Sequence, residues 1–377
     1  MPRPHRRRTL LAVTGAALLT SVIVAGQAVA AAPVPIPPLT PSPFPVAAPS
    51  DLPLPPPTLP DEMFAPVDRP GPELSVPEAE LDAAVRCTAD AAGADRNVVL
   101  FVPGTTQTPE VNFGFNWFPA LDALDRPYCS VTLPNNAMTD TQTASEYVVH
   151  AIRHVHEISG HRVDVVGHSQ GGTEPRFALR FWPDLREMVD DYIALGSTNH
   201  GSIVINAALC TPATGCAEAL WQQTLNSHYT QAINSYQETF AGISYTQIYT
   251  RTDEFVQPNL DDSGTTSLRG GDGEITNVAL QDVCPADVAS EHLAVGTYSP
   301  VAYALAMDAI DHDGPADPGR VDRSVCTELF MPGVDPLTFP ADYAAVATLI
   351  AEQLALAPKV GSEPALRPYT LAEPADG

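Results

Sequence analysis

The stretch from Asp164 to Gly172, with the sequence DVVGHSQGG, constrains the fold more than any other part of the chain. An apolar run rich in β-branched residues leads into Ser169, which has a glycine two positions away on each side, and helix-compatible sequence follows. Small residues at Gly167 and Gly171 allow a strand and a helix to approach closely, and a helix N-terminus offers N–H donors to negative charge. The pattern therefore predicts a nucleophilic serine on a sharp turn at the carboxyl end of a buried strand.

Strands and helices alternate on both sides of this turn. A helical pattern over Pro77 to Arg86 leads into an apolar run at Asn97 to Val102, which is typical of a strand buried on both faces. Apolar residues at helical spacing predict a helix from Thr141 to Ser159, which Gly160 ends. The other expected strands are Tyr192–Leu195, Tyr245–Thr250 and Ile275–Leu280, and the other expected helices Val301–Ile310 and Ala341–Leu356. This order predicts an α/β protein with the α/β-hydrolase fold, a mostly parallel sheet covered by helices on both faces.

The N-terminal part of the chain has a different composition. Four arginines precede the apolar stretch from Leu10 to Gly26, and the small-residue sequence Ala28-Val29-Ala30 follows, which predicts a signal peptide at residues 1–30 and an exported protein. Seventeen of the 39 prolines lie between Pro33 and Pro77. Residues 31–75 are expected to be either an extended spacer, which could associate with a cell wall, or a disordered pro-segment. Residues 76–377 are then the catalytic domain.

Charge narrows the range of partners. The formal net charge is −26, so binding to nucleic acid or to anionic lipid headgroups is not expected. No second long apolar run follows the signal peptide, so no stable membrane insertion is expected either. A neutral substrate fits this composition best.

A serine nucleophile needs an imidazole to take its proton and a carboxylate to orient that imidazole. In α/β-hydrolases the order along the chain is serine, acid, histidine, each at the carboxyl end of a strand. Asp253 follows an expected strand directly. Position favours His292 over His312, which lies in a turn after a helix, and over His200, which precedes any candidate acid.

Six cysteines in an exported chain indicate disulfides, and 15 pairings are possible, of which Cys210–Cys216 is the most local. His150 and His154 lie four residues apart, but neither a cysteine nor a suitably spaced carboxylate completes a metal site. We expect neither a metal nor a cofactor.

Several motifs in one order resemble the Candida antarctica lipase B-like triacylglycerol lipases, over about Cys87 to Leu356. The matching segments are Val102–Thr105, Asn116–Trp117, Thr139–Gln142, Ser169–Gly172, Trp221–Gln223, Thr252–Glu254, Val256–Pro258 and Val283–Cys284. The resemblance implies that Ser169, Asp253 and His292 form the catalytic triad. It also implies an oxyanion hole at the backbone N–H groups of Thr105 and Gln170, with the Thr105 hydroxyl as a third donor.

The resemblance further implies the disulfides Cys87–Cys129 and Cys284–Cys326, which leaves Cys210 and Cys216 together. Two expected substrate-binding positions depart from the family's pattern: His168 stands where the family has tryptophan, and Thr198 where it has aspartate. Chain-length and stereochemical preferences are therefore not expected to transfer. The apolar run Ile203–Leu209 is either a rim that contacts the acyl chain or buried packing.

Together these observations predict a secreted serine hydrolase of carboxylic esters, either a lipase or a carboxylesterase. Two alternatives remain open from the sequence. The same triad could transfer acyl groups to an alcohol or sugar at the cell wall, or the chain could be an inactive hydrolase scaffold that binds partners at the surface.

Overall fold

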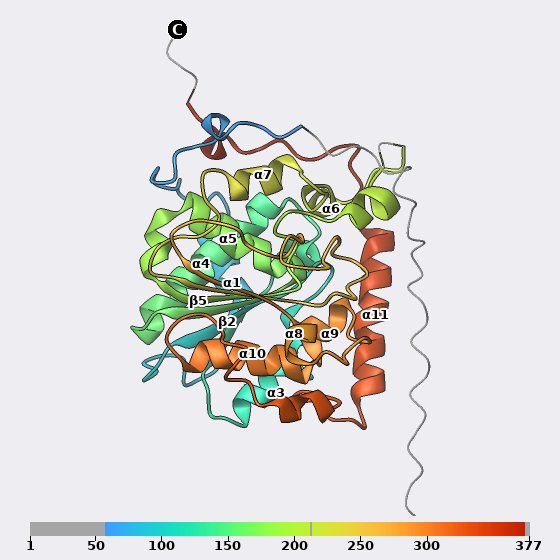
Figure 1. The fold of residues 1–377 in the computed structure, drawn as a ribbon. Coiled ribbons are helices and arrows are strands. Elements are labelled where there is room, and N and C mark those ends of the chain that lie inside the picture. Colours follow the sequence, from blue (N-terminus) through green and yellow to red (C-terminus); the bar gives the residue numbers. More distant parts are fainter. Residues whose placement is uncertain (1–56, 212, 374–377) are drawn as a thin grey trace, which may run out of the picture. The chain divides into compact units, whose positions relative to one another are not determined.

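The computed structural model describes residues 57–211 and 213–373 (Figure 1). The expected signal peptide and residues 31–56 of the proline-rich segment lie outside these residues.

A seven-stranded sheet runs through the middle of the molecule in the order β1-β3-β2-β4-β5-β6-β7. β1 pairs with β3 in antiparallel register, and the other neighbouring pairs are parallel. The strands are β1 Val85–Cys87, β2 Val98–Val102, β3 Tyr128–Val131, β4 Val163–His168, β5 Val189–Leu195, β6 Ser244–Tyr249 and β7 Glu274–Ala279. The predicted fold class, a mostly parallel sheet of the α/β-hydrolase type, is confirmed.

Helices cover both faces of the sheet (Figure 1). In β2, Leu100 packs into one apolar cluster with α4 and α5, whereas Phe101 points into a second cluster with α3 and α10. The helices are α1 Glu78–Ala84, α2 Pro109–Phe113, α3 Trp117–Asp122, α4 Thr141–Ser159, α5 Thr173–Phe181, α6 Glu218–Gln222, α7 His228–Asn234, α8 Leu280–Val283, α9 His292–Thr297, α10 Pro300–Asp311 and α11 Phe339–Leu356. Burial on both faces explains why β2 has a continuous apolar sequence.

Local sequence signals predict the bounds of α4 correctly but place the end of the first helix too late. α4 has the predicted bounds, because the Asp140 side chain caps its first turn and Gly160 adopts a left-handed conformation with φ of 74° at its end. The helix expected over residues 77–86 ends earlier, at Ala84. The next three residues form β1, because they pair with β3 and Cys87 is bonded to Cys129.

The prediction that the proline-rich spacer extends to residue 75 is wrong for its last part, because residues 57–75 pack against the body of the enzyme. Phe64 is fully buried in the cluster under α4 and α5. The Pro72 carbonyl accepts a hydrogen bond from Trp182 Nε1 at 2.9 Å, and Ser75 Oγ donates to Glu146 at 2.7 Å. The folded domain therefore begins before residue 76, because proline-rich backbone still offers carbonyl acceptors and apolar side chains to a core.

Three disulfides join Cys87–Cys129, Cys210–Cys216 and Cys284–Cys326, the pairing that was expected. Such bonds persist in oxidising compartments. In residues 57–211 and 213–373, we find no helix that is both long enough and apolar enough to span a bilayer.

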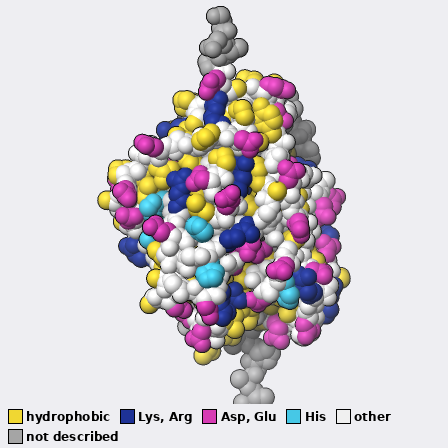
Figure 2. Space-filling model, turned by 90° about the vertical axis from the view of Figure 1, so that its left-hand side faces the viewer, with side chains coloured by type: hydrophobic (Ala, Val, Ile, Leu, Met, Phe, Trp, Pro, Cys, Tyr) yellow, Lys and Arg dark blue, Asp and Glu magenta, His cyan; other side chains and the backbone are white. Residues whose placement is uncertain are grey.

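The face turned away from α11 carries acidic side chains spread across it, with basic side chains interspersed among them (Figure 2). The excess of acidic residues, 45 against 19 basic ones, is thus mixed with positive charge on this face.

Phe64→Ala tests whether the 57–75 segment belongs to the folded domain. Removing a fully buried phenylalanine should lower the free energy of unfolding by about 3 kcal/mol, measured by urea denaturation. The exposed neighbour supplies the control, and Met63→Ala should change stability by less than about 0.5 kcal/mol. Equal stability of the two variants would show that the segment is only a spacer.

Candidate active site

Ser169 lies on a strained turn between β4 and α5. Its φ is 56°, a left-handed conformation that non-glycine residues rarely adopt. A Cβ atom at Gly167 would lie 2.1 Å from the Gly171 carbonyl oxygen, and one at Gly171 would lie 2.2 Å from the Val102 carbonyl oxygen. Only glycine fits either position, so β2, β4 and the helix that follows converge at the serine.

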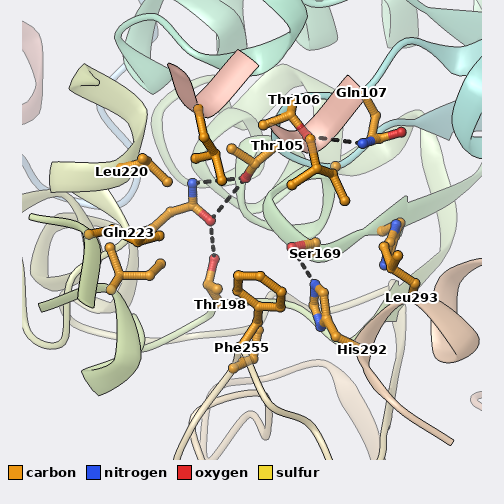
Figure 3. A pocket seen from close by; sticks show the side chains of 17 residues that line it. Thr105, Thr106, Gln107, Ser169, Thr198, Leu220, Gln223, Phe255, His292 and Leu293 are labelled. Carbon is orange, nitrogen blue, oxygen red and sulfur yellow. Dashed lines mark hydrogen bonds between the residues drawn. The ribbon is translucent and has the colours of Figure 1, made fainter. Parts of the chain in front are cut away.

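His292 lies between Ser169 and Asp253. Its Nε2 is 2.9 Å from Ser169 Oγ, and its Nδ1 is 2.9 Å from Asp253 Oδ2 (Figure 3 shows the serine–histidine contact). All three residues are buried, with Ser169 8 % exposed. The structure thus brings together the three residues that the sequence singled out, in the geometry of a nucleophile, a base and an orienting acid.

The acid and the base are positioned by the ends of the last two strands. Asp253 follows β6, and its Oδ1 accepts hydrogen bonds from the backbone N–H groups of Phe255 at 2.9 Å and Val256 at 2.6 Å. Its other oxygen therefore remains free to face the imidazole. His292 is the first residue of α9, which follows β7 and the short helix α8. Its backbone N–H donates to Glu254 Oε2 at 3.0 Å.

The imidazole of His292 is surrounded by acids. Burial lowers its pKa, but the charges of Asp253, Glu254 and Glu291, together with the hydrogen bond to Asp253, outweigh burial and raise the pKa to about 9. The free site therefore favours an imidazolium more strongly than an isolated histidine would.

The other candidate histidines lie elsewhere. His312 Nδ1 contacts the Asp308 carbonyl at 2.8 Å, and its side chain is half-exposed. His200 bridges the Thr265 carbonyl and Glu238, at 3.0 Å and 3.1 Å. Neither contacts Ser169 through any hydrogen bond found in the described part of the chain.

Thr105 and Gln170, the expected oxyanion residues, share one hydrogen-bond network with Gln223. Thr105 Oγ1 donates to Gln170 Oε1 at 2.7 Å, and Gln223 Nε2 donates to the same oxygen at 2.7 Å. Gln223 also meets the Thr198 hydroxyl at 3.2 Å, so its amide is turned toward both threonines (Figure 3). Gln170 follows Ser169 in the first helical turn, where backbone N–H groups lack partners within the helix.

A pocket of about 610 Å³, its open mouth included, lies over Ser169. Its titratable lining residues are His168 and His292. The apolar part of the lining comes from five separate regions of the chain, namely Ile205 with Leu209, Leu220, Val256, Leu293, and Ile350 with Leu354 of α11. An uncharged wall of this kind suits an apolar chain rather than an ionic group.

Both expected substrate-binding residues line this pocket. His168 is buried and its Nδ1 lies 3.1 Å from Asn112 Oδ1. Burial and the neighbouring His292 lower the pKa of His168 to about 3, so its ring is neutral. Thr198 is held by Gln223, as described above.

The Ile203–Leu209 run is partly rim and partly packing. Ile205 and Leu209 line the pocket, and Ile205 also packs with the Cys210–Cys216 disulfide. Cys216 pairs with Val360 beyond α11 through a short antiparallel bridge, so the backbone at Cys216 joins this segment to the chain after α11.

Three features of the site were not anticipated from sequence: the roles of Glu254, Glu291 and Gln223. Glu291 caps α9 by accepting from the backbone N–H groups of residues 293 and 294, and it also accepts from the hydroxyls of Tyr298 and Tyr343. The sequence does offer one signal for the role of Glu291, because it directly precedes His292 at the start of a helix, where a side-chain acceptor can cap the first turn.

Among the described residues, one group of three acids could place oxygens around a cation: Asp164, Asp190 and Asp191. It lies at the opposite end of β4 from Ser169, and Asp190 is paired with Arg162 at 2.6 Å. His150 is instead paired with Asp82 at 2.9 Å.

Comparison with known proteins agrees with this geometry. Residues 134–283 match the family model of class 2 lipases. Lipase B of Pseudozyma antarctica is 31 % identical over 303 residues, which cover 79 % of this chain and 86 % of that protein. The crystal structure of Aspergillus fumigatus lipase B matches with a TM-score of 0.71 and 32 % identity, over 84 % of this chain and 77 % of that one. The chain therefore belongs to the class 2 lipase family together with these lipases B, and its activity class is that of a lipase or esterase.

Proposed function

We propose that the protein is an exported serine hydrolase that cleaves uncharged carboxylic esters through Ser169, His292 and Asp253. The observation that carries this proposal is the continuous set of contacts from Ser169 Oγ through His292 to Asp253 at the base of a pocket with an apolar wall.

In the proposed first step, Ser169 Oγ attacks the ester carbonyl carbon while its proton passes to His292 Nε2. The carbonyl π electrons move to oxygen, and the backbone N–H groups of Thr105 and Gln170 stabilise that oxyanion. Asp253 holds the imidazole in the correct tautomer and compensates its positive charge. Loss of one oxyanion donor typically raises such a barrier by about 3 kcal/mol.

The tetrahedral intermediate then expels the alcohol oxygen, which takes the proton from His292, and an acyl-enzyme remains on Ser169. Water enters, gives a proton to His292 and attacks the acyl carbon. Breakdown of the second intermediate releases the carboxylic acid and restores the serine hydroxyl.

The substrate proposal is a neutral acyl ester or lipid whose chain contacts the apolar lining. Hydrolysis of nitrophenyl esters of increasing chain length, compared with emulsified triglyceride, measures this preference. Product analysis with an added acceptor alcohol tests hydrolysis against acyl transfer, since a transferase forms the new ester at the expense of free acid.

We also propose export from the cell, supported by the N-terminal sequence pattern and by three disulfides. Association of the proline-rich segment with the cell wall is part of this proposal, and fractionation of culture medium and cell envelope tests it.

Variants of the triad test the catalytic roles. Ser169→Ala, His292→Ala and Asp253→Asn should each lower kcat/KM by at least about 10³-fold, and combining them should add little, because the residues act as a unit. A fluorophosphonate probe should label the native protein at Ser169. His312→Ala is the control and should retain activity. If His292→Ala were active and His312→Ala inactive, the assignment of His292 as the base would be wrong.

The pH dependence follows from the acids around His292. The general base must be neutral, and its pKa is raised to about 9, so kcat/KM for a neutral ester should fall as the pH drops through that range. Glu254→Gln removes one of the surrounding charges and should move this acidic limb of the pH profile of kcat/KM to lower pH. Asp261→Asn, at an exposed loop position, should leave the limb in place. A limb near pH 6.5 in the native protein would contradict the expected effect of these acids.

A further inference from the structure

Glu174 is an acid buried behind the oxyanion residues that the mechanism above does not use. It lies in the first turn of α5, five residues after Ser169, and its side chain is fully buried. Gln170 Nε2 donates to Glu174 Oε1 at 2.6 Å, and the Thr173 hydroxyl is 3.5 Å from Oε2. A buried carboxyl beside the nucleophile turn needs a physical reason to be there.

The surroundings of Glu174 favour a neutral carboxyl. Glu174 takes part in no salt bridge found within residues 57–211 and 213–373. Arg176, two residues along the same helix, is held by Asn234 at 2.9 Å. The titratable groups facing it are the phenols of Tyr229 from α7 and Tyr192 from β5, whose pKa values burial raises. Burial likewise raises the pKa of Glu174 to about 8.

The contacts of Gln170 show what this carboxyl does. Gln170 Oε1 accepts from both Thr105 and Gln223, so the amide oxygen must face the pocket side and the NH₂ group must face away from it. Glu174 accepts from that NH₂ group. If the acceptor were removed, the Gln170 amide could turn over and present its NH₂ to the NH₂ of Gln223, which is a donor facing a donor.

We infer that Glu174 is a positioning residue of the oxyanion hole, and that its neutral form fixes the Gln170 amide so that Thr105 and Gln223 stay aligned at the pocket wall. The inference rests on the proposed function, because it concerns the same oxyanion. It assigns Glu174 no contact with substrate.

The charge state of Glu174 has a consequence for catalysis. A carboxylate at this depth would place negative charge one side chain away from the site where the oxyanion forms, in surroundings that screen it poorly. Ionisation of Glu174 should therefore slow acyl transfer to Ser169 as the pH rises through about 8.

The test compares Glu174→Gln with the native enzyme on a neutral nitrophenyl ester over pH 6 to 10. Glutamine keeps an oxygen acceptor for Gln170 but cannot ionise. The ratio of kcat/KM, variant over native, cancels the titration of His292. We expect a ratio near one below pH 7 that rises to about ten above pH 9. Glu146→Gln, at another buried glutamate on the same side of the sheet, should give a flat ratio.

Glu174→Leu separates positioning from packing. It retains bulk but removes the acceptor, so kcat should fall about ten-fold while KM changes less than about two-fold, and circular dichroism should show a folded protein. A flat ratio for Glu174→Gln, or full kcat in Glu174→Leu, would overturn the inference. Failure of the proposed function gives a different result, namely unchanged activity in Ser169→Ala.

Discussion

The site depends on the contact between backbones at the end of β4. Gly167 and Gly171 let β4 and the turn after it approach to a distance that no side chain allows, and Ser169 takes a left-handed conformation between them. Because β4 lies at the centre of the sheet, between β2 and β5, both its neighbours contribute. The loop after β2 brings Thr105 to one side of the serine, while Gly196 after β5 lies against the ring of His292. A shift in that contact would therefore move the oxyanion residues and the base together.

The parallel sheet explains why residues so far apart in sequence meet. Ser169, Asp253 and His292 follow β4, β6 and β7, whose carboxyl ends lie along one edge of the sheet. The three residues lie at different separations in sequence from the ends of their strands, and local contacts hold each side chain at the site. Asp253 is held by two backbone N–H groups in its own turn, and His292 is held by the start of α9 and by Glu254.

Much of this arrangement was predictable from sequence because it depends on local rules. The β-branched run before Ser169, the order of serine, acid and histidine, and the cap and glycine that bound α4 are all read within a few residues. The contacts that were missed depend on tertiary placement. In the sequence, Phe64 belongs to a proline-rich stretch. Only its packing with α5 and the C-terminal segment shows that it is a core residue. Gln223 and Tyr343 reach the site from helices whose position no local pattern specifies.

The acids around the site differ in how many hydrogen-bond donors each one has, although burial raises the pKa of both Glu291 and Glu174. Glu291 accepts from two backbone N–H groups and two tyrosine hydroxyls beside the imidazole. Burial raises the pKa of Glu291 to about 7, and its negative charge, where present, favours the imidazolium that catalysis produces. Glu174, behind the oxyanion residues, has one amide and one distant hydroxyl, and burial favours its neutral form by raising its pKa to about 8. A reaction that creates positive charge on His292 and negative charge near Thr105 is stabilised by this arrangement, because the carboxyl with four donors lies beside the place where the cation forms, and the carboxyl with few donors lies behind the place where the anion forms.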